Sequence, residues 1–349
     1  NNAFRFNTRP TISVPFQTSS GFIKPKASFQ YTQYSISKNL AVAGDTSISR
    51  ALPILSLDTG AFFEKELDLG SSPMTHSIEP RLYYLYVPYQ NQDNIPLLDT
   101  AAYDFVFDSL FRENQFSGRD RWQNANQVSA AITNRLMDSK GKERLRFTLG
   151  DIFYFQDRKV FLTETASTSP IVTELNAALT DHISVETGMQ WDPHTNDIRR
   201  GKAALHYTNQ PDGIFNAGYY YRRNPLIPDH LDDIVQTDVS FHWPIYDGWS
   251  AVGRWQYSLL YDRTQEGFFG VEKENCCWRF RLMGRHYLSG LPANSALTGA
   301  NVGINQTLAN GTAQTSVFFQ VELKGLMGFG EQIGQFFERN IYGYRAPKE

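Results

Sequence analysis

The chain has 349 residues, a formal charge of −3 and a pI near 6.2, and its charges are interspersed without a basic run, which excludes a nucleic-acid partner. Aromatic residues make up 14% of the chain, with 25 Phe and 18 Tyr, yet the mean hydropathy is −0.42. No stretch approaches the ~18 consecutive apolar residues of a membrane-spanning helix. Residues 1–4 show no signal peptide, so we expect a cytosolic protein or a mature or trimmed piece of a longer one.

Alternation of apolar and polar residues with a period of two recurs along the chain, in about fifteen segments of roughly 9–15 residues each. Soluble strands usually run ~5–6 residues, whereas tilted strands that cross a bilayer need ~9–11. In chain order, clear examples are ISVETGMQW (183–191), DIVQTDVSFHW (233–243), GWSAVGRWQYSLLYD (248–262) and TAQTSVFFQVELK (312–324). This pattern predicts strands with one apolar and one polar face.

One segment, ERLRFTLGDIFYF (143–155), departs from strict alternation because its apolar set Leu145, Phe147 and Leu149 continues to Asp151. A β-bulge at Gly150–Asp151 would reset the register.

Aromatic residues gather near the ends of the predicted strands, as in the interfacial girdles of outer-membrane barrels. The expected fold class is therefore all-β, a transmembrane antiparallel β-barrel, and a large soluble β-sandwich is the alternative. The rings in question are Tyr83, Tyr84, Tyr86, Trp191, Trp243, Trp249 and Trp278.

The polar face of these strands carries mixed charges that would line a wet lumen in a wide barrel. Arginines there would hold phosphate groups by charge-assisted hydrogen bonds. Glutamates beside them would keep the binding at each site weak, so that a substrate passes along many sites. The predicted lumen-facing residues are Glu79, Arg81, Arg135, Arg144, Arg146, Glu174, Glu186, Arg254, Arg279, Arg281 and Glu322.

Cys276 and Cys277, the two cysteines of the chain, are adjacent in ENCCWRFRL. Their Cα atoms lie ~3.8 Å apart, below the ~4.4–6.8 Å of an unstrained disulfide, so a bond between them is disfavoured. Long and short connections alternate along the chain, as in barrels with short periplasmic turns, which assigns the pair to a periplasmic turn. Because the periplasm is oxidising, we expect each thiol to have a partner elsewhere; two free thiols are the alternative.

Signatures of catalysis and of cofactor binding are missing from the sequence. It contains no GxSxG elbow, no HExxH helix, no phosphate-binding loop with its Lys and no Cys/His set at zinc spacing. We therefore expect no enzyme activity, no cofactor and no metal site.

Several blocks resemble the LptD family of lipopolysaccharide-assembly proteins: residues 77–136, RLRFTLGDIFYFQDRKV (144–160), ENCCWRFRL (274–282) and FQVELKGL (319–326). The resemblance spans nearly the whole chain. It implies the carboxy-terminal part of a very large barrel in the outer membrane of a Gram-negative bacterium. Residues 1–324 would form this partial barrel, with a long outer loop at 88–126, and residues 325–349 a tail.

By this resemblance, the chain would help move lipopolysaccharide through the lumen and a lateral gate into the outer leaflet, in contact with outer-membrane lipid. A general or substrate-specific porin is the alternative. Further implied partners are the lipoprotein plug LptE and, through a missing amino-terminal domain, the periplasmic bridge protein LptA. Cys276 and Cys277 would bond two cysteines of the missing amino-terminal portion.

The resemblance also implies roles for two sets of residues. One edge of the lateral gate would be the last strand, Thr312–Lys324, with Thr315, Val317, Phe319, Val321 and Leu323. Residues of the long loop expected to fold inward or to touch the plug are Phe107, Phe111, Arg112, Phe116, Arg119 and Arg121.

Overall fold

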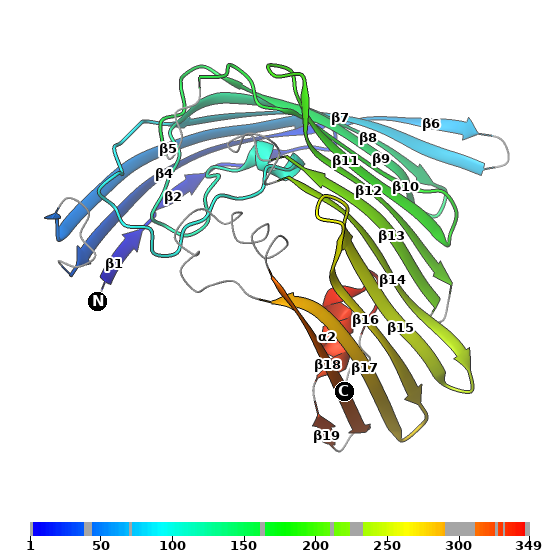
Figure 1. Ribbon diagram of the computed structural model, residues 1–349. Helices are drawn as coiled ribbons and strands as arrows, with labels where there is room; N and C mark the ends of the chain where they lie inside the picture. Colours follow the sequence, from blue (N-terminus) through cyan, green and yellow to red (C-terminus); the bar gives the residue numbers. More distant parts are fainter. Residues whose placement is uncertain are drawn as a thin grey trace. The chain divides into compact units, whose positions relative to one another are not determined.

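The computed structural model describes residues 3–37, 44–69, 72–160, 165–209, 213–223, 233–289, 311–324, 327–330 and 332–345. These residues fold almost entirely as antiparallel strands (Figure 1), which confirms the expected all-β class. The chain divides into two compact units. The first comprises Asn1–Glu174 and Gln190–Asp197, and the second Leu175–Met189 and Ile198–Glu349.

The first unit is a sheet in which β4 pairs with β1, β2 and β3 along one edge and with β5 along the other. Beyond β5 the order continues through β7 and β8 to β9, and β6 pairs with β7. The elements are β1 (Ala3–Thr8), β2 (Thr11–Ser13), β3 (Phe16–Gln17), β4 (Gly21–Ile36), β5 (Ser47–Ala61), β6 (Phe63–Leu69), β7 (Ser72–Val87), η2 (Phe107–Phe111), β8 (Ala125–Asp138) and β9 (Glu143–Tyr154).

The second unit is a sheet of sequential antiparallel strands, in which each strand from β12 to β19 pairs with the next. Strands β10 (Ile171–Ala178), β11 (Ile183–Asp192) and β12 (Asp197–Asn209) have residues in both units. The remaining elements are β13 (Gly213–Arg222), β14 (Ile234–Tyr246), β15 (Trp249–Ser258), β16 (Arg263–Glu274), β17 (Trp278–Ser289), β18 (Thr312–Leu323), β19 (Met327–Gly330) and α2 (Ile333–Asn340).

The described strands number nineteen, where the alternation indicated about fifteen segments. Three short strands account for most of the difference, because β2, β3 and β19 have three, two and four residues. A period of two cannot be recognised over so few positions.

The expectation of a β-bulge at Gly150–Asp151 is wrong. Gly150 pairs with Ala131 and Asp151 with Ala130 in unbroken register, and the irregularity between β8 and β9 lies instead at Leu136/Met137. Asp151 keeps its place on the otherwise apolar side because its Oδ1 accepts hydrogen bonds from Ser169 Oγ and from the Ile152 amide, both at 2.6 Å.

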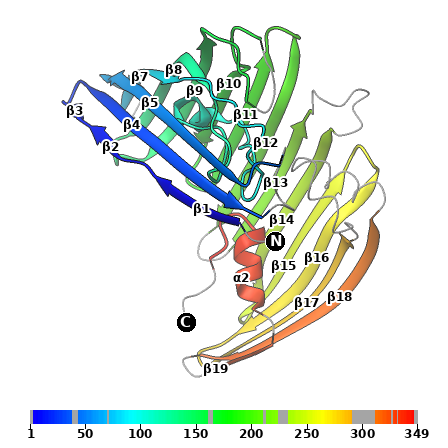
Figure 2. The ribbon, with the colours of Figure 1, turned by 90° about the vertical axis from the view of Figure 1, so that its left-hand side faces the viewer.

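Helix α2 lies against one face of the second unit's sheet (Figure 2), which we call the helix face. Ile333 and Phe337 of α2 are buried there against Val252, Phe268 and Met283. The sequence predicted only a tail at 325–349, because a helix of eight residues spans barely two turns and shows little periodicity. Among the described residues, no helix has the length and apolarity to cross a membrane.

A tight turn at Asp247–Gly248 joins β14 to β15, and both residues have positive φ, 46° and 71°. Two central residues with positive φ are typical of the type I′ hairpin turn, where glycine is favoured. A Cβ at Gly248 would also collide with the backbone carbonyl oxygen of Glu274. The turn therefore depends on glycine at this position.

Gly248→Ala is expected to lower the free energy of unfolding by about 1–3 kcal/mol, because it strains the backbone. The measurement is urea unfolding of the full-length parent protein in detergent. Gly284→Ala is the matched control, because Gly284 lies within β17 of the same unit and a Cβ there would meet nothing within 4 Å. Equal unfolding midpoints for the two variants would contradict the prediction.

Candidate functional site

In the first unit, the long segment between β7 and β8 packs on one face of the sheet, which we call the loop face. Leu110 of η2 is fully buried against Ile152 and Tyr154 of β9, and its carbonyl accepts a hydrogen bond from Ser129 Oγ. The Arg81 guanidinium lies 3.7 Å from the centre of the Phe111 ring, a cation–π contact. The segment is therefore an ordered layer on its own strands.

Two buried charged residues hold this segment in place. Arg50 of β5 donates to the carbonyl oxygens of Arg119 (2.6 Å) and Asp120 (2.8 Å). The Asp120 carboxylate accepts from Arg5 at 2.7 Å and from the Leu98 amide at 2.7 Å. Arg5 also bonds Asp99, which holds the pKa of the Asp99 carboxyl well below its usual range. Asp120 thus has a charged partner, as its burial requires. Arg50 is held through its two Nη atoms, while its Nε has no hydrogen-bond partner among the described residues.

All six predicted loop residues make contacts within the first unit. Phe107 and Phe111 contact each other edge to face, and Phe111 also contacts Tyr83 in this way. Arg112 lies over the Tyr103 ring, and Phe116 forms an isolated bridge with Ala102. Arg119 supplies its carbonyl to Arg50, and Arg121 Nη1 donates to the Asp120 carbonyl. Phe111 and Arg119 thus contact strands of their own sheet, while Arg112, Phe116 and Arg121 make these contacts within the long segment. Contact with a plug stays a prediction.

The predicted polar residues of the first unit all have partners there. Arg135 bridges Glu79 (3.0 Å) and Glu143 (2.8 Å). Arg81 pairs with Asp58, Arg144 with Asp138, Arg146 with Glu143, and Glu174 accepts from the Phe107 amide.

In the second unit, the predicted arginines of β17 stand in a ladder of charges. The register places Glu272, Arg281 and Gln320 in one row across β16, β17 and β18, and Glu274, Arg279 and Glu322 in the next. Arg281 donates to Glu272 at 2.5 Å, and Arg279 donates to Glu322 at 3.0 Å. The side chains of both arginines are 3% exposed and those of Glu272 and Glu322 are 8% and 12% exposed, so these four are buried or nearly so, whereas Glu274 is 34% exposed.

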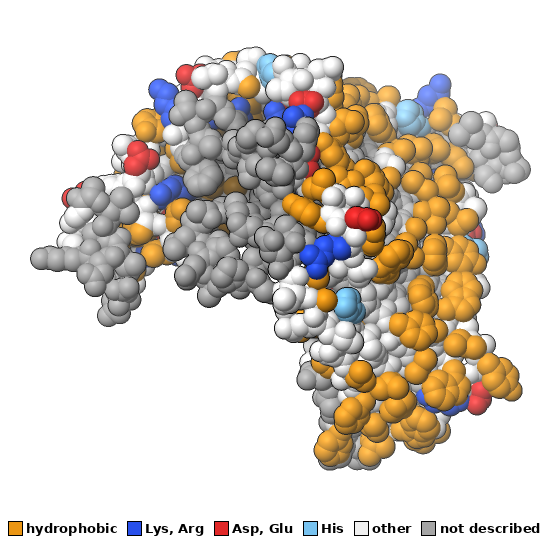
Figure 3. Space-filling model, viewed as in Figure 1, with side chains coloured by type: hydrophobic (Ala, Val, Ile, Leu, Met, Phe, Trp, Pro, Cys, Tyr) orange, Lys and Arg blue, Asp and Glu red, His pale blue; other side chains and the backbone are white. Residues whose placement is uncertain are grey.

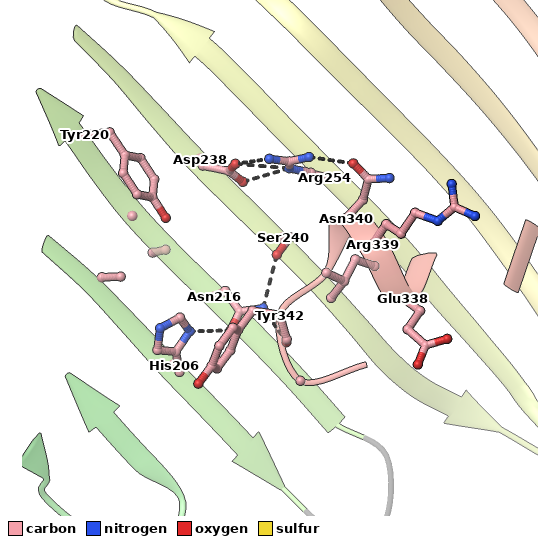
Figure 4. A pocket seen from close by; sticks show the side chains of 15 residues that line it. His206, Asn216, Tyr220, Asp238, Ser240, Arg254, Glu338, Arg339, Asn340 and Tyr342 are labelled. Atoms are coloured by element: carbon pink, nitrogen blue, oxygen red, sulfur yellow. Dashed lines mark hydrogen bonds and ion pairs between the residues drawn. The ribbon is translucent and has the colours of Figure 1, made fainter. Parts of the chain in front are cut away.

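Elsewhere in the second unit, Glu186 pairs with Lys202 at 2.7 Å, and Arg254 pairs with Asp238 at 2.5 Å. Arg254 also lines a cavity of about 340 Å³ between the strands of the helix face and residues 338–343, which comprise the end of α2 and the three residues after it (Figure 4). His206, Asn216, Tyr220 and Ser240 lie in its wall. No pattern in the sequence indicated this cavity, because its second wall comes from residues 338–343, more than 80 residues along the chain from Arg254.

Cys276 and Cys277 occupy the turn between β16 and β17, as expected, and both are exposed. Asn275 Oδ1 holds the turn by accepting from the amides of Cys277 and Trp278, each at 2.9 Å. The two Sγ atoms are 2.8 Å apart, longer than the ~2.05 Å of a disulfide. The hydrogen bond with Cys276 raises the pKa of the Cys277 thiol.

Strand β18 pairs with β17 along Thr312–Leu323, while its other edge pairs with β19 only from Gln320 to Leu323. Val317 is 72% exposed and Phe319 60% exposed on one face, and Thr315 Oγ1 bonds His286 Nδ1 at 3.0 Å. Val321 pairs with Phe280 and Phe329, and Leu323 with Trp278 and Met327. The predicted gate strand therefore has an edge whose first part pairs with no described residue.

Arg281→Met is expected to lower the free energy of unfolding of the full-length parent by ~3–5 kcal/mol, because it removes the nearest partner of the buried Glu272 carboxylate and leaves only His242 at 3.8 Å and Arg279 at 4.0 Å. Arg146→Met is the control, since its side chain is 42% exposed beside Glu143 and such pairs contribute ~0–1 kcal/mol. Urea unfolding in detergent measures both. Losses of unfolding free energy of similar size in the two variants would contradict the prediction that the buried pair matters more than the exposed one.

Comparison with known proteins bears on this arrangement. The family model described as "LptD: LPS transport system D" matches residues 1–249. Three proteins named "LPS-assembly protein LptD" cover nearly this whole chain. The Methylococcus capsulatus protein is 35% identical over 99% of this chain and 35% of its own length. The Nitrosococcus oceani protein is 38% identical over 98% of this chain and 44% of its own length. The Pseudomonas syringae pv. tomato protein is 34% identical over 100% of this chain and 41% of its own length.

The chain thus spans 35–44% of the length of these relatives. The siderophore receptor PirA from Acinetobacter baumannii superposes with a TM-score of 0.45 at 9% identity, over 95% of this chain and 59% of that one, which is too low to establish a shared fold. The family model, in contrast, covers 249 of the 349 residues. The resemblance seen in the sequence is confirmed, and the chain belongs to the LptD family.

Proposed function

We propose that this chain is part of a transmembrane β-barrel that transports lipopolysaccharide to the outer leaflet of the outer membrane of a Gram-negative bacterium. The observation that carries the proposal is the two-faced character of the strands. Within β18, Val317 and Phe319 are exposed on one face, while Gln320 and Glu322 bond arginines on the other. One face thus suits lipid and the other suits the polar part of an amphiphile.

Apolar side chains gather on the surface of the second unit (Figure 3). Phe269, Trp255 and Leu282 are exposed there although large and apolar. A contiguous apolar surface of this kind marks an interaction site or a membrane-facing surface. Strand pairing supports the membrane reading, because hydrocarbon offers no partner for backbone N–H and C=O groups.

The aromatic residues at the β14–β15 turn fit the headgroup level of a bilayer. Trp243, Tyr246 and Trp249 are all exposed around that turn. Amphipathic rings are enriched at membrane–water interfaces, where one side is apolar and the other wet. Their position supports placement of this turn at one surface of the membrane.

A porin is not favoured as the alternative, because the relatives are named as assembly proteins. None of these names describes an enzyme, and the proposed role needs no catalytic chemistry and no cofactor. The barrel would supply path and selectivity, while the energy would come from elsewhere.

The charged faces are proposed to line the lipopolysaccharide path. Arg81, Arg135 and Arg254 are each paired with a carboxylate. An arginine whose charge is already balanced binds a passing phosphate less tightly than an isolated one, so the substrate is not trapped. This supports weak contacts at many positions over one strong site.

The proposed partners fit the described surfaces. The ordered segment on the loop face would contact the lipoprotein plug LptE, with Phe107, Phe116 and Arg119 among its contact residues. The periplasmic bridge protein LptA would act through an amino-terminal domain of the parent protein. Residues 1–324 would belong to the barrel, residues 325–349 would follow it, and β18 would form one edge of a lateral gate.

A photoreactive residue on β18 is expected to capture lipopolysaccharide in cells that carry the full-length parent. Position Ser316, opposite Arg285 on the charged face, and position Phe319, on the apolar face of the gate edge, should both crosslink. Position Phe269 is the matched control, since it is also a Phe, 60% exposed, on a strand that is paired on both sides.

Immunoblotting for lipopolysaccharide measures the adducts. Absence of adducts at both Ser316 and Phe319 would contradict the transport proposal. Adducts of equal yield at Phe319 and Phe269 would contradict a gate at β18 alone.

Cys276 and Cys277 are proposed to tether an upstream periplasmic domain, each through a disulfide to an upstream cysteine. Their exposure and their position in a short, hydrogen-bonded turn leave both Sγ atoms accessible to such partners. Non-reducing peptide mapping of the parent from native outer membranes should find each cysteine linked to a distant peptide. Alkylation of both cysteines by iodoacetamide without prior reduction would show that both thiols are free, and would contradict the proposed tether.

A further inference from the structure

An apolar band crosses the helix face of the second unit, from β13 to β18. Phe268 stands beside it, opposite Arg254 and Arg285 on the neighbouring strands. The register places the following residues in a single row: Ile214, His242, Val252, Gly270, Met283 and Phe318. The residues that we call the apolar band belong to one packed cluster and are Ile214, Val252, Phe268, Met283 and Phe318.

Polar side chains border the band on both sides. The neighbouring row toward the cysteine turn contains Glu272, Arg281 and Gln320. The row on the other side contains, apart from Phe268, the residues Asn216, Ser240, Arg254, Arg285 and Ser316. The helix face is therefore polar on either side of an apolar stretch.

The band has the length of a lipid acyl chain. Neighbouring strands lie ~4.8 Å apart, so the steps from β13 to β18 make the row ~24 Å long. The hydrocarbon core of a bilayer is ~30 Å thick, which leaves ~15 Å for the chains of one leaflet. An extended acyl chain therefore fits along the band.

Residues 333–344, which comprise α2 and the four residues after it and which we call the cover, lie over this band (Figure 2). Phe337 stacks on Phe268 with ring centres 5.8 Å apart. The Tyr344 ring contacts His242, the polar member of the row, with centres 5.1 Å apart. The buried residues of the cover recur at intervals of four, four and three positions and are Ile333, Phe337, Ile341 and Tyr344.

The other side of the cover is polar. Gln335, Glu338 and Arg339 are exposed on α2, and Tyr342 is 66% exposed. The cover thus buries its apolar side on the band and presents amide, charged and hydroxyl groups in its place. With the cover bound, the helix face is polar across the band as well.

Hydrogen bonds fix the cover to the polar rows on both sides of the band. At its start, the first amide of α2 donates to Gln320 Oε1 at 3.1 Å. Near its end, Arg254 donates to Asn340 Oδ1 at 2.7 Å. The Tyr342 carbonyl accepts from Asn216 Nδ2 at 3.1 Å. Because Gln320 belongs to one row and Arg254 and Asn216 to the other, the cover is held across the band.

We propose that the cover keeps the acyl chains of lipopolysaccharide off the apolar band. This inference rests on the proposed function, because it takes the helix face as a wall of the lipopolysaccharide path. Apolar surfaces attract hydrocarbon without need of a specific partner. An uncovered band would therefore retain the lipid part of a passing amphiphile, whereas the polar side of the cover makes only weak contacts with it.

The strand ladder does not depend on the cover. Each strand from β12 to β18 pairs with the next through its own backbone. The cover can therefore be detached or removed without loss of a ladder hydrogen bond, and the band can be examined in a folded protein.

The test places azidophenylalanine, a photoreactive analogue of Phe, at position Phe268 of the full-length parent in cells. With the cover bound, it should crosslink within the chain to Phe336 or Phe337, whose rings lie 5.0 and 5.8 Å away. Phe337→Asp puts a charge into the apolar cluster and should detach the cover. Adducts of position Phe268 with lipopolysaccharide, measured by immunoblotting, should then rise at least tenfold.

Gln335→Asp is the matched control, because it introduces the same side chain on the exposed side of α2. It should leave the adducts at the level of the unaltered parent. Deletion of residues 332–349 removes the cover without a new charge and should raise the adducts as much as Phe337→Asp does. Alkaline hydrolysis of the adduct should leave a fatty acid on the Phe268 peptide, which identifies the captured part as an acyl chain.

Several results would overturn the inference. They are lipopolysaccharide adducts at Phe268 in the unaltered parent, a sugar without a fatty acid on the peptide, and a phospholipid fatty acid in an adduct that antibodies to lipopolysaccharide do not recognise. Failure of both variants to fold, measured by heat-dependent migration in electrophoresis, would also overturn it, because α2 would then be a part of the core that the barrel requires.

If both variants fold and position Phe268 captures no lipopolysaccharide, while position Ser316 of the unaltered parent does, this inference falls and the proposed function stands. If positions Ser316 and Phe319 capture none either, both fall.

Discussion

Antiparallel pairing turns successive side chains to opposite faces of the sheet, and the rest of the structure depends on this two-residue period. On β17, Arg279 and Arg281 point to the face that holds buried carboxylates, while Leu282 points to the exposed apolar face. A slip of one residue would exchange the two faces along the whole strand. The charged and apolar faces are therefore fixed together by one choice of register.

Burial of the arginines in turn organises the carboxy-terminal segment. Gln320 Oε1 accepts from Arg281 at 3.0 Å and from the first amide of α2, Ile333 N, at 3.1 Å. One side chain thus bonds a buried guanidinium and also satisfies a free N–H at the start of a helix. The charge ladder and the docking of α2 are parts of one network.

Local pattern was enough to predict the strands, because alternation needs only neighbouring residues, and the connection lengths were enough to place the cysteines in a turn. Partners distant in the sequence were not predictable. Asp151 is accommodated by Ser169, 18 positions away, so no bulge forms. The cavity at His206 and the fold of the segment anchored by Arg50 and Asp120 depend on side chains 70 or more positions apart, which no periodicity reveals.

Arg50 holds the long segment through the backbone carbonyls of Arg119 and Asp120, and Trp122 is held in the same way, its carbonyl accepting from Gln92 at 2.7 Å. A carbonyl is present whatever the side chain. The path of the segment over the sheet is thus separated from the chemistry that it displays at Arg119. Related chains could present different side chains at this position to different partners on an unchanged support.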